Sequence, residues 1–318
     1  MQILFSADWH IKLGQKNVPI DWAKNRYNEF FSQIQSIEQS CDIHIIGGDI
    51  FDRVPSLEEL ELYFDFIKNC SIETYIYDGN HEATKKNKTF FTALKEVTRA
   101  INNKVTIIDD IFKTDSFSIL PYCSLYQKNS IESLPHKNPV FTHVRGEIPP
   151  HVTPEVDLKR FEKFPIVFAG DLHSHSNSQL NIVYPGSPMT TSFHRSKVDT
   201  GVLSIDTLTW EWEWIKLKLP QLIRKTIQNP DEMVKGDYDY IIYELEGDLG
   251  DLAKVSSTDL LDKKLIKRNS ETSLILEKDM SIGEELIEYL KYILQIDEKK
   301  IPQIIGIYND YAKTLEME

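Results

Sequence analysis

The sequence predicts an α/β fold in which strands and helices alternate to build a layered sheet. Short runs rich in Val, Ile, Phe and Tyr recur through the first two thirds of the chain, and segments with helical apolar spacing separate the first of them. In folds of this kind, ligands bind beyond the carboxyl ends of the strands. Polar residues that directly follow a strand are therefore the first candidates for a functional site.

Strands and helices follow one another in a regular order. The runs with the length and composition of strands are residues 2–7, 42–48, 73–79, 104–109, 117–122, 138–144 and 165–171. Helices are predicted over residues 22–39 and 56–69. The second helix begins after Ser56, with Glu59 three residues later, which is the pattern of a capping box.

The regular alternation of strands and helices changes near residues 220–230. Residues 200–219 predict a hairpin in which alternate tryptophans share one packed face, namely Trp210, Trp212 and Trp214. Two further strands and two helices are predicted over residues 238–245, 272–278, 281–295 and 298–316. We expect a main domain, a small acidic α/β domain and a pair of C-terminal helices, over residues 1–218, 219–280 and 281–318.

Composition excludes several classes of protein. A chain of 318 residues can bury a large core. No basic segment followed by an apolar stretch stands at the N-terminus and no run of about 18 apolar residues occurs, so we expect neither a secretory leader nor a membrane partner. Three cysteines without CxxC spacing, Cys41, Cys70 and Cys123, predict reduced, buried thiols of a cytoplasmic protein.

The net charge of −13 argues at first against a nucleic-acid partner. Much of this charge lies at the C-terminal end. Residues 219–318 contain 13 Lys and Arg against 21 Asp and Glu, a net charge of −8. Several acids of the first 218 residues are candidate metal ligands, whose charge bound cations would offset.

Five strand ends in succession deliver Asp, Asn or His. These residues are Asp8 and His10, Asp49, Asn80 and His81, His143, and Asp171 and His173. Each motif alone is weak evidence, because Gly-Asp is common in turns and a single His at a strand end is more often structural. Together, at the edge of the sheet where ligands bind, they predict a metal site.

The mixed Asp, Asn and His set favours first-row divalent ions such as Mn²⁺ or Fe²⁺ over an oxygen-liganded Ca²⁺ site. One carboxylate that bridges two ions holds them about 3.5–4 Å apart, the spacing used in two-metal hydrolysis of phosphoesters. A neighbouring imidazole can protonate or stabilise the leaving oxygen.

The order Asp-x-His, Gly-Asp, Gly-Asn-His, His and Gly-x-x-His resembles the calcineurin-like metallophosphoesterase superfamily. The segments "GDIFDR" and "GNHE" look like those of Ser/Thr protein phosphatases. The segments "SADWHIKLG" and "YPGSPMTTSF" are closer to SbcD-type DNA-repair nucleases of the meiotic recombination eleven family, and a phage recombination nuclease subunit is the subtype expected. The resemblance spans about residues 1–218 and implies a layered β-sandwich flanked by helices, with the acidic remainder as a capping domain and a tail for a partner ATPase.

The resemblance also implies roles for the strand-end residues. Asp8, His10, Asp49 and His173 would hold the first of two Mn²⁺ ions, with Mg²⁺ or Fe²⁺ as alternatives. Asp49 would bridge to the second ion, which Asn80 and His143 would also hold. His81 would be the catalytic acid or transition-state stabiliser.

This sequence departs from the family at one ligand. The family has Gly-His-x-His where this chain has Gly170-Asp171-Leu172-His173, so we expect Asp171 to replace an imidazole on the second ion. His175 is left without a role in that pattern. We expect it to contact a metal ligand without binding the metal itself, to contact DNA, or to be an exposed loop residue.

Basic residues near the site loops are candidates for contacts to the DNA backbone, although such charges are usually solvated surface. They are Lys85, Lys86, Arg145, Arg195 and Lys197. Asp52 and Arg53 are expected to brace the Asp49 turn through an Arg–carboxylate contact. His44 is expected to be a hydrogen-bonded strand residue. The remaining loop histidines, His136, His151 and His194, have no metal-ligand spacing.

The family implies a DNA exonuclease and endonuclease subunit, present as a homodimer within a heterotetramer with an SbcC-type, SMC-like ATPase. The chain has no phosphate-binding loop of the form GxxxxGK[ST], so a partner would hydrolyse ATP. The C-terminal stripe of Ile282, Leu286, Tyr289, Leu290 and Ile293 is either intramolecular core or a surface for that partner. The alternatives are a phosphomonoesterase or protein phosphatase with the same metals, and a non-catalytic DNA-end scaffold.

Overall fold

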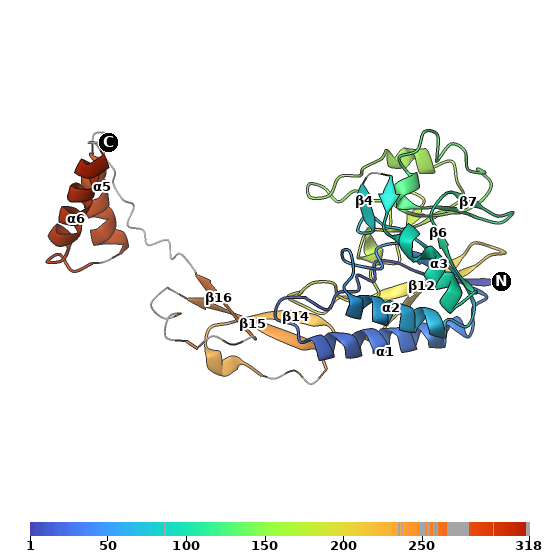
Figure 1. The fold of residues 1–318 in the computed structure, drawn as a ribbon, viewed down its shortest axis with the longest axis horizontal. Coiled ribbons are helices and arrows are strands. Elements are labelled where there is room, and N and C mark those ends of the chain that lie inside the picture. Colours follow the sequence, from blue (N-terminus) through green and yellow to red (C-terminus); the bar gives the residue numbers. More distant parts are fainter. Residues whose placement is uncertain are drawn as a thin grey trace. The chain divides into compact units, whose positions relative to one another are not determined.

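The computed structural model describes the chain apart from residues 86, 235, 237, 248–251, 253–254, 257, 259, 266–279, 295 and 316–318. The chain forms two compact units (Figure 1). One comprises Met1–Leu245 with Ser257–Asp262, and the other comprises Glu246–Ser256 with Lys263–Glu318.

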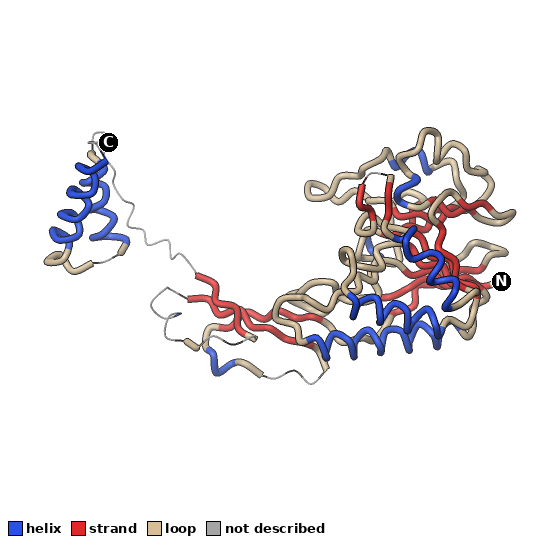
Figure 2. Tube along the Cα trace, in the orientation of Figure 1, coloured by secondary structure: helices blue, strands red, loops and turns tan. Residues whose placement is uncertain are grey.

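Two mixed sheets form the centre of the larger unit (Figure 2). The first has the order β13-β12-β1-β2-β3-β6, made of β1 (Gln2–Ser6), β2 (Ile43–Gly47), β3 (Glu73–Tyr77), β6 (Val105–Ile108), β12 (Gly201–Asp206) and β13 (Trp212–Lys216). The second has the order β11-β10-β9-β8-β7, made of β7 (Phe112–Lys113), β8 (Ser118–Leu120), β9 (Val140–His143), β10 (Val167–Gly170) and β11 (Ile182–Val183). Strands β1, β2, β3 and β6 are parallel, as are β8 to β11. Their carboxyl ends therefore gather the strand-end residues.

Alternating side chains divide each strand between two apolar layers. In β1, Ile3 and Phe5 face the layer between the sheets, where Phe141 of β9 stacks on Phe168 of β10. Leu4 faces the opposite layer. That layer packs against α1 (Ile20–Glu38), α2 (Leu57–Asn69) and α3 (Phe91–Ile101). The result is the predicted sandwich of sheets flanked by helices.

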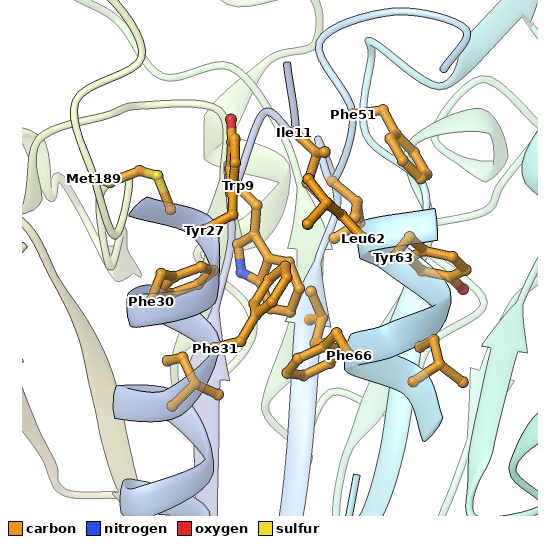
Figure 3. Packing of buried hydrophobic residues seen from close by; sticks show 14 of the residues in the cluster. Trp9, Ile11, Tyr27, Phe30, Phe31, Phe51, Leu62, Tyr63, Phe66 and Met189 are labelled. Carbon is orange, nitrogen blue, oxygen red and sulfur yellow. The ribbon is translucent and has the colours of Figure 1, made fainter. Parts of the chain in front are cut away.

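Trp9 anchors the segment between the candidate ligands Asp8 and His10. Its fully buried ring lies between α1 and α2, in edge-to-face contact with Phe30 and Phe66 at 5.1 and 4.8 Å (Figure 3). Its Nε1 donates to Ser6 Oγ, which satisfies the one polar atom of the ring. Packing of this indole therefore fixes where the chain leaves β1.

Several local predictions are confirmed. All seven strands of the first two thirds and both helices are present, and Ser56 and Glu59 form the capping box. His44 is fully buried and bonded to Glu38 and Ser6. The three cysteines are free and buried. The hairpin prediction was wrong in two details. Trp210 lies in the turn before β13, with a φ of 60° and its N–H bonded to the Asp206 carbonyl, although it packs against the same core as Trp214. Trp212 is exposed.

The remaining elements were only partly predicted. The short strands β4 (Ala83–Lys85) and β5 (Lys88–Thr89) and the helix α3 were not expected, nor was β14 (Leu222–Ile227), which pairs parallel to β15 (Tyr240–Gly247) in a sheet with β16 (Leu261–Leu265). Short 3₁₀ turns cover Tyr122–Ser124, Leu158–Phe161, His175–Asn177 and Pro230–Glu232. The strand predicted over residues 272–278 lies outside the described residues, and the domain boundaries at 218 and 280 remain predictions.

The smaller unit contains α5 (Ile282–Glu288), a π-helical turn (Tyr289–Ile293) and α6 (Ile301–Leu315). Of the predicted stripe, Leu290 is buried and Leu286 half-buried, whereas Ile282, Tyr289 and Ile293 are exposed. Within the described part of the chain, no helix combines the length and apolar character needed to cross a membrane.

Candidate metal centre and active site

The structure brings all eight predicted strand-end residues to one place. Potential ligand atoms converge within 4.8 Å in three overlapping groups: Asp8, His10 and His173; His10, Asp49 and His81; and Asp8, Asp49 and His143. The side chains of Asp8, His10, Asp49 and His143 are buried, whereas His81 is 36% exposed. Carboxylates and imidazoles that are buried but open to solvent on one side suit metal ions to which a substrate must also bind.

The first candidate position lies among Asp8, His10, Asp49 and His173. The Nε2 atoms of His10 and His173 are 3.1 Å apart, and Asp49 Oδ2 is 3.6 Å from His10 Nε2. Thr191 Oγ1 lies 3.2 Å from the other nitrogen of His173, which helps to orient that ring.

The second candidate position surrounds the side-chain amide of Asn80. Its oxygen lies 3.1 Å from His143 Nε2, and the same atom position is 3.2 Å from Asp171 Oδ1 and 3.3 Å from Asp49 Oδ2. With its nitrogen in this position, the two N–H hydrogens of Asn80 face three acceptors. With its oxygen there, four acceptor atoms converge. The second arrangement is the one that a cation satisfies, so the residues fit a metal ion here.

Asp49 lies between the two positions. Its Oδ2 is 3.5 Å from His143 Nε2 and 3.6 Å from His10 Nε2. One carboxylate oxygen therefore faces a candidate ligand of each metal position. His143 Nδ1 donates to the Gly47 carbonyl at 2.8 Å. A carbonyl only accepts, so Nδ1 keeps its hydrogen, and it is Nε2 that becomes free for a cation when His143 is deprotonated.

Left-handed backbone turns aim these side chains. Asp8, His10 and Asp49 have φ values of 58°, 46° and 52°, and Asp171 has a φ of 107°. Gly48, between β2 and Asp49, has a φ of 83°, and a Cβ there would lie 2.6 Å from His143 Nδ1. Only glycine fits this close approach.

Glu82 is a site residue that the analysis of the sequence did not single out. Its buried carboxylate accepts from the backbone N–H groups of Asp49, Phe51 and Gly79 at 2.9, 2.9 and 2.8 Å. Burial and then the charge of Asp49 raise the pKa of Glu82 to about 8, while the N–H donors favour its ionised form. The only signal in the sequence was its place directly after His81 in "GNHE".

The Tyr-Pro-Gly-Ser segment, residues 184–187, bonds to the turns that carry Asp8 and His173. Ser187 Oγ donates to the Asp8 carbonyl at 2.7 Å, and Ser187 N donates to the His173 carbonyl at 3.1 Å. Gly186, with a φ of 78°, permits the close approach, because a Cβ there would lie 2.9 Å from the His173 carbonyl oxygen. The segment therefore ties the β1 turn to the β10 turn.

Asp171 lies at the second candidate position but also has a cationic neighbour. Arg145 Nε is 3.3 Å from Asp171 Oδ1 and 3.4 Å from Oδ2, and Arg145 Nη1 is 3.6 Å from Glu155 Oε1. The carboxylate that we expect to replace an imidazole is thus accompanied by a guanidinium that offsets its charge.

The other basic candidates lie in varied surroundings. Lys85 is exposed in β4 and lines a hollow of about 430 Å³ together with Asn80. Arg195 contacts Glu244 and Lys197 contacts Asp239, at 3.0 and 2.7 Å. Lys86 lies outside the described residues.

Two predictions beside the site can also be located. The Arg–carboxylate contact expected at the Asp49 turn joins Arg53 to Glu59, while Asp52 contacts Lys12. The ring of His175 packs on the ring of Trp214, and His175 Nδ1 bonds to the Tyr184 carbonyl.

Burial and neighbouring charges together decide which of the candidate ligands carry protons. It lowers the pKa of His10 to about 3, which keeps that imidazole neutral. Burial also raises the pKa of Asp8 well above its usual value. It opposes protonation of His143, but the Asp49 carboxylate outweighs this and raises the pKa of His143. Protons therefore compete with cations for Asp8 and His143.

Comparison with known proteins agrees with this geometry. The model of the calcineurin-like phosphoesterase family matches residues 1–155. The chain is 40% identical over 328 residues to "Probable exonuclease subunit 1" of Escherichia phage T5, covering 98% of this chain and 99% of that protein. The chain belongs to the calcineurin-like phosphoesterase family. Family membership and the metallophosphoesterase fold, both expected from the sequence, are thereby confirmed.

A second relative and two solved structures match over shorter stretches of the chain. "Putative phosphoesterase 244L" of Invertebrate iridescent virus 6 is 31% identical over 226 residues, covering 64% of this chain and 74% of that protein. A solved archaeal phosphodiesterase is 15% identical and covers 68% of this chain and 100% of its own, with a TM-score of 0.39. A solved Thermus thermophilus protein is 10% identical and covers 68% of this chain and 98% of its own, with a TM-score of 0.43.

Glu82→Gln should weaken the centre without removing a ligand. The amide places N–H donors against backbone N–H donors, so we expect the free energy of unfolding to fall by about 1–3 kcal/mol. Affinity for divalent cations should fall about 10–100-fold. Urea unfolding and Mn²⁺ titration calorimetry measure the two effects, with Glu96→Gln on the exposed face of α3 as the control. Wild-type cation affinity in Glu82→Gln would contradict this role.

Cation affinity should rise with pH. Asp8 and His143 have raised pKa values and retain protons that a cation must displace, so affinity falls as the pH falls, by up to about tenfold per pH unit for each proton displaced. Calorimetric titrations at pH 6 and pH 8, in buffers of different ionisation enthalpy, count the released protons. Binding without proton release would mean that the ligands are already deprotonated.

Proposed function

We propose that this chain is the nuclease subunit of a phage-encoded complex that processes DNA ends in recombination, located in the host cytoplasm. It would degrade double-stranded DNA as an exonuclease and cut single strands as an endonuclease, with two Mn²⁺ ions. The observation that carries this proposal is the complete two-cation donor set in a chain 40% identical, over almost its whole length, to a protein named as an exonuclease subunit.

Residues of both candidate positions would hold the ions. Asp8, His10, Asp49 and His173 form the first donor set, and Asp49, Asn80, His143 and Asp171 form the second. Bound divalent cations supply stabilisation of the phosphate charge and a water of lowered pKa. The donor types suit Mn²⁺, with Mg²⁺ or Fe²⁺ as alternatives.

His81 would act as the proton donor. Its backbone N–H donates to Asp49 Oδ1 at 2.9 Å, and its Nδ1 lies 2.6 Å from the Asp52 carbonyl. Because a carbonyl only accepts, Nδ1 carries a hydrogen, and Nε2 is the atom on the side of the centre, 3.9 Å from Asp49 Oδ2. A protonated Nε2 can donate to the oxygen that leaves during cleavage.

Basic side chains beside the centre would hold the DNA backbone. Arg145 lines the same cleft as Asn80 and His81, and Lys85 lines the neighbouring hollow. Lys86, His175 and Arg195 are the other candidates from the sequence. Each phosphate contact should steepen the decrease of affinity with salt.

A partner ATPase of the SbcC type would complete the complex, with the nuclease subunit as a homodimer within a heterotetramer. The word "subunit" in the relative's name supports a partner. Exposed apolar side chains of the smaller unit, Ile282, Tyr289, Tyr292, Leu294 and Ile307, support a docking surface there. The 219–280 region would act as the capping domain.

The test is Mn²⁺-dependent degradation of linear duplex DNA by the purified chain, with and without the ATPase. His81→Ala should lower the rate of cleavage about 100–10,000-fold, the usual contribution of a general acid, while Mn²⁺ affinity is retained. His136→Ala, on a loop where the ring contacts Phe164, is the control and should cleave like the wild type. A wild type that ignores DNA but hydrolyses phosphomonoesters would establish the phosphatase alternative instead.

Asp171→Asn tests the unusual ligand separately. The substitution removes the carboxylate charge but preserves the shape of the side chain, so we expect the number of bound Mn²⁺ ions to fall from about two to about one. Asp115→Asn, at an exposed loop, should bind as the wild type does. Two ions of unchanged affinity in Asp171→Asn would remove Asp171 from the ligand set.

A further inference from the structure

A second pocket adjoins the metal centre through a shared ligand. It has a volume of about 600 Å³, within the range of roughly 300–1,000 Å³ of small-molecule sites. His173 lines both this pocket and the cleft that contains Asn80 and His81. A group held at the cations and a group in this pocket would therefore be neighbours.

The lining of the pocket suits a flat, neutral, partly polar group. Met189, Val198 and Trp214 contribute apolar surface, while Asn177 and Thr200 contribute an amide and a hydroxyl. No Lys or Arg is among the described residues that line it, and the carboxylate of its one acidic lining residue, Asp199, is paired with Lys216. A phosphate chain would find no cation there, whereas a nucleobase with its sugar would find aromatic surface and hydrogen-bond partners.

The aromatic wall of the pocket is held in place before any ligand binds. The rings of His175 and Trp214 are stacked at 17°, with centroids 5.6 Å apart, and both line the pocket. Trp214 Nε1 donates to the Pro185 carbonyl at 2.9 Å, and His175 Nδ1 to the Tyr184 carbonyl at 2.6 Å. Because these rings are already fixed, a stacked base would cost little additional ordering.

We propose that this pocket binds the nucleoside of the terminal nucleotide of a DNA strand, while the adjoining phosphate lies at the metal centre. The proposal rests on the nuclease function proposed above and adds to it a basis for recognising strand ends. A separated terminal base can enter such a pocket, whereas a base pair within a duplex cannot.

Nucleotide binding to the Mn²⁺-loaded protein tests the proposal. The probes are deoxyadenosine 5′- and 3′-monophosphate, with inorganic phosphate as the probe that lacks a nucleoside. We expect wild-type protein to bind the better nucleotide at least about tenfold more tightly than phosphate, as base stacking would give.

Two variants fill the pocket from two separate segments of the chain, and one control places the same bulky side chain outside the pocket. Val198→Trp and Asn177→Trp should lose the preference for nucleotide while phosphate affinity stays unchanged. Leu208→Trp, at an exposed turn of the β12–β13 hairpin, should keep the preference. Unchanged phosphate affinity and thermal unfolding identify variants that fold normally.

Equal affinity of the wild type for nucleotide and phosphate would overturn the proposal, as would a full nucleotide preference in both filled variants. The nuclease proposal fails on a different result, namely the absence of DNA cleavage by wild-type protein. The two failures are therefore read from separate measurements.

Discussion

The arrangement of the metal centre depends on one buried carboxylate. Glu82 accepts backbone N–H groups from the turn after β2 and from the turn after β3, and so joins the segments that carry Asp49 and Asn80. Burying a carboxylate is unfavourable unless it is hydrogen-bonded, and three donors provide that compensation. Because Asp49 faces both candidate cation positions, a shift of its turn would disturb both at once.

Charge balance is the second constraint on the centre. Three carboxylates, on Asp8, Asp49 and Asp171, lie among imidazoles and beside Arg145. Two divalent cations would exceed the carboxylate charge by about one unit, and an imidazole in place of Asp171 would leave a larger excess. The guanidinium of Arg145, which lies against Asp171, adds one positive charge and brings the excess back to about two units, the same as with an imidazole at position 171.

The apolar strands made the fold predictable from the sequence, and the polar residues at their ends made most of the candidate centre predictable. Apolar runs located β1, β2, β3, β9 and β10, and the candidate ligands end these strands or follow them. Glu82 was missed because its role is to accept backbone N–H groups, which no pattern of side chains reports. The partner of Arg145 was also missed, since the two residues are 26 positions apart and meet only through the pairing of β9 with β10. Trp210 was misplaced because alternation in the sequence continues through a turn that reverses the chain.

The positive φ values at Asp8, His10, Asp49 and Asp171 restrict how this site can change. Among residues with a side chain, Asp, Asn and His enter this region of backbone space most readily, and β-branched residues do so with strain. The same three residue types are ligands for divalent cations. Backbone conformation and donor chemistry thus select the same small set of amino acids. An exchange between imidazole and carboxylate at position 171 is open to mutation, while replacement by Thr, Val or Ile would oppose both requirements at once.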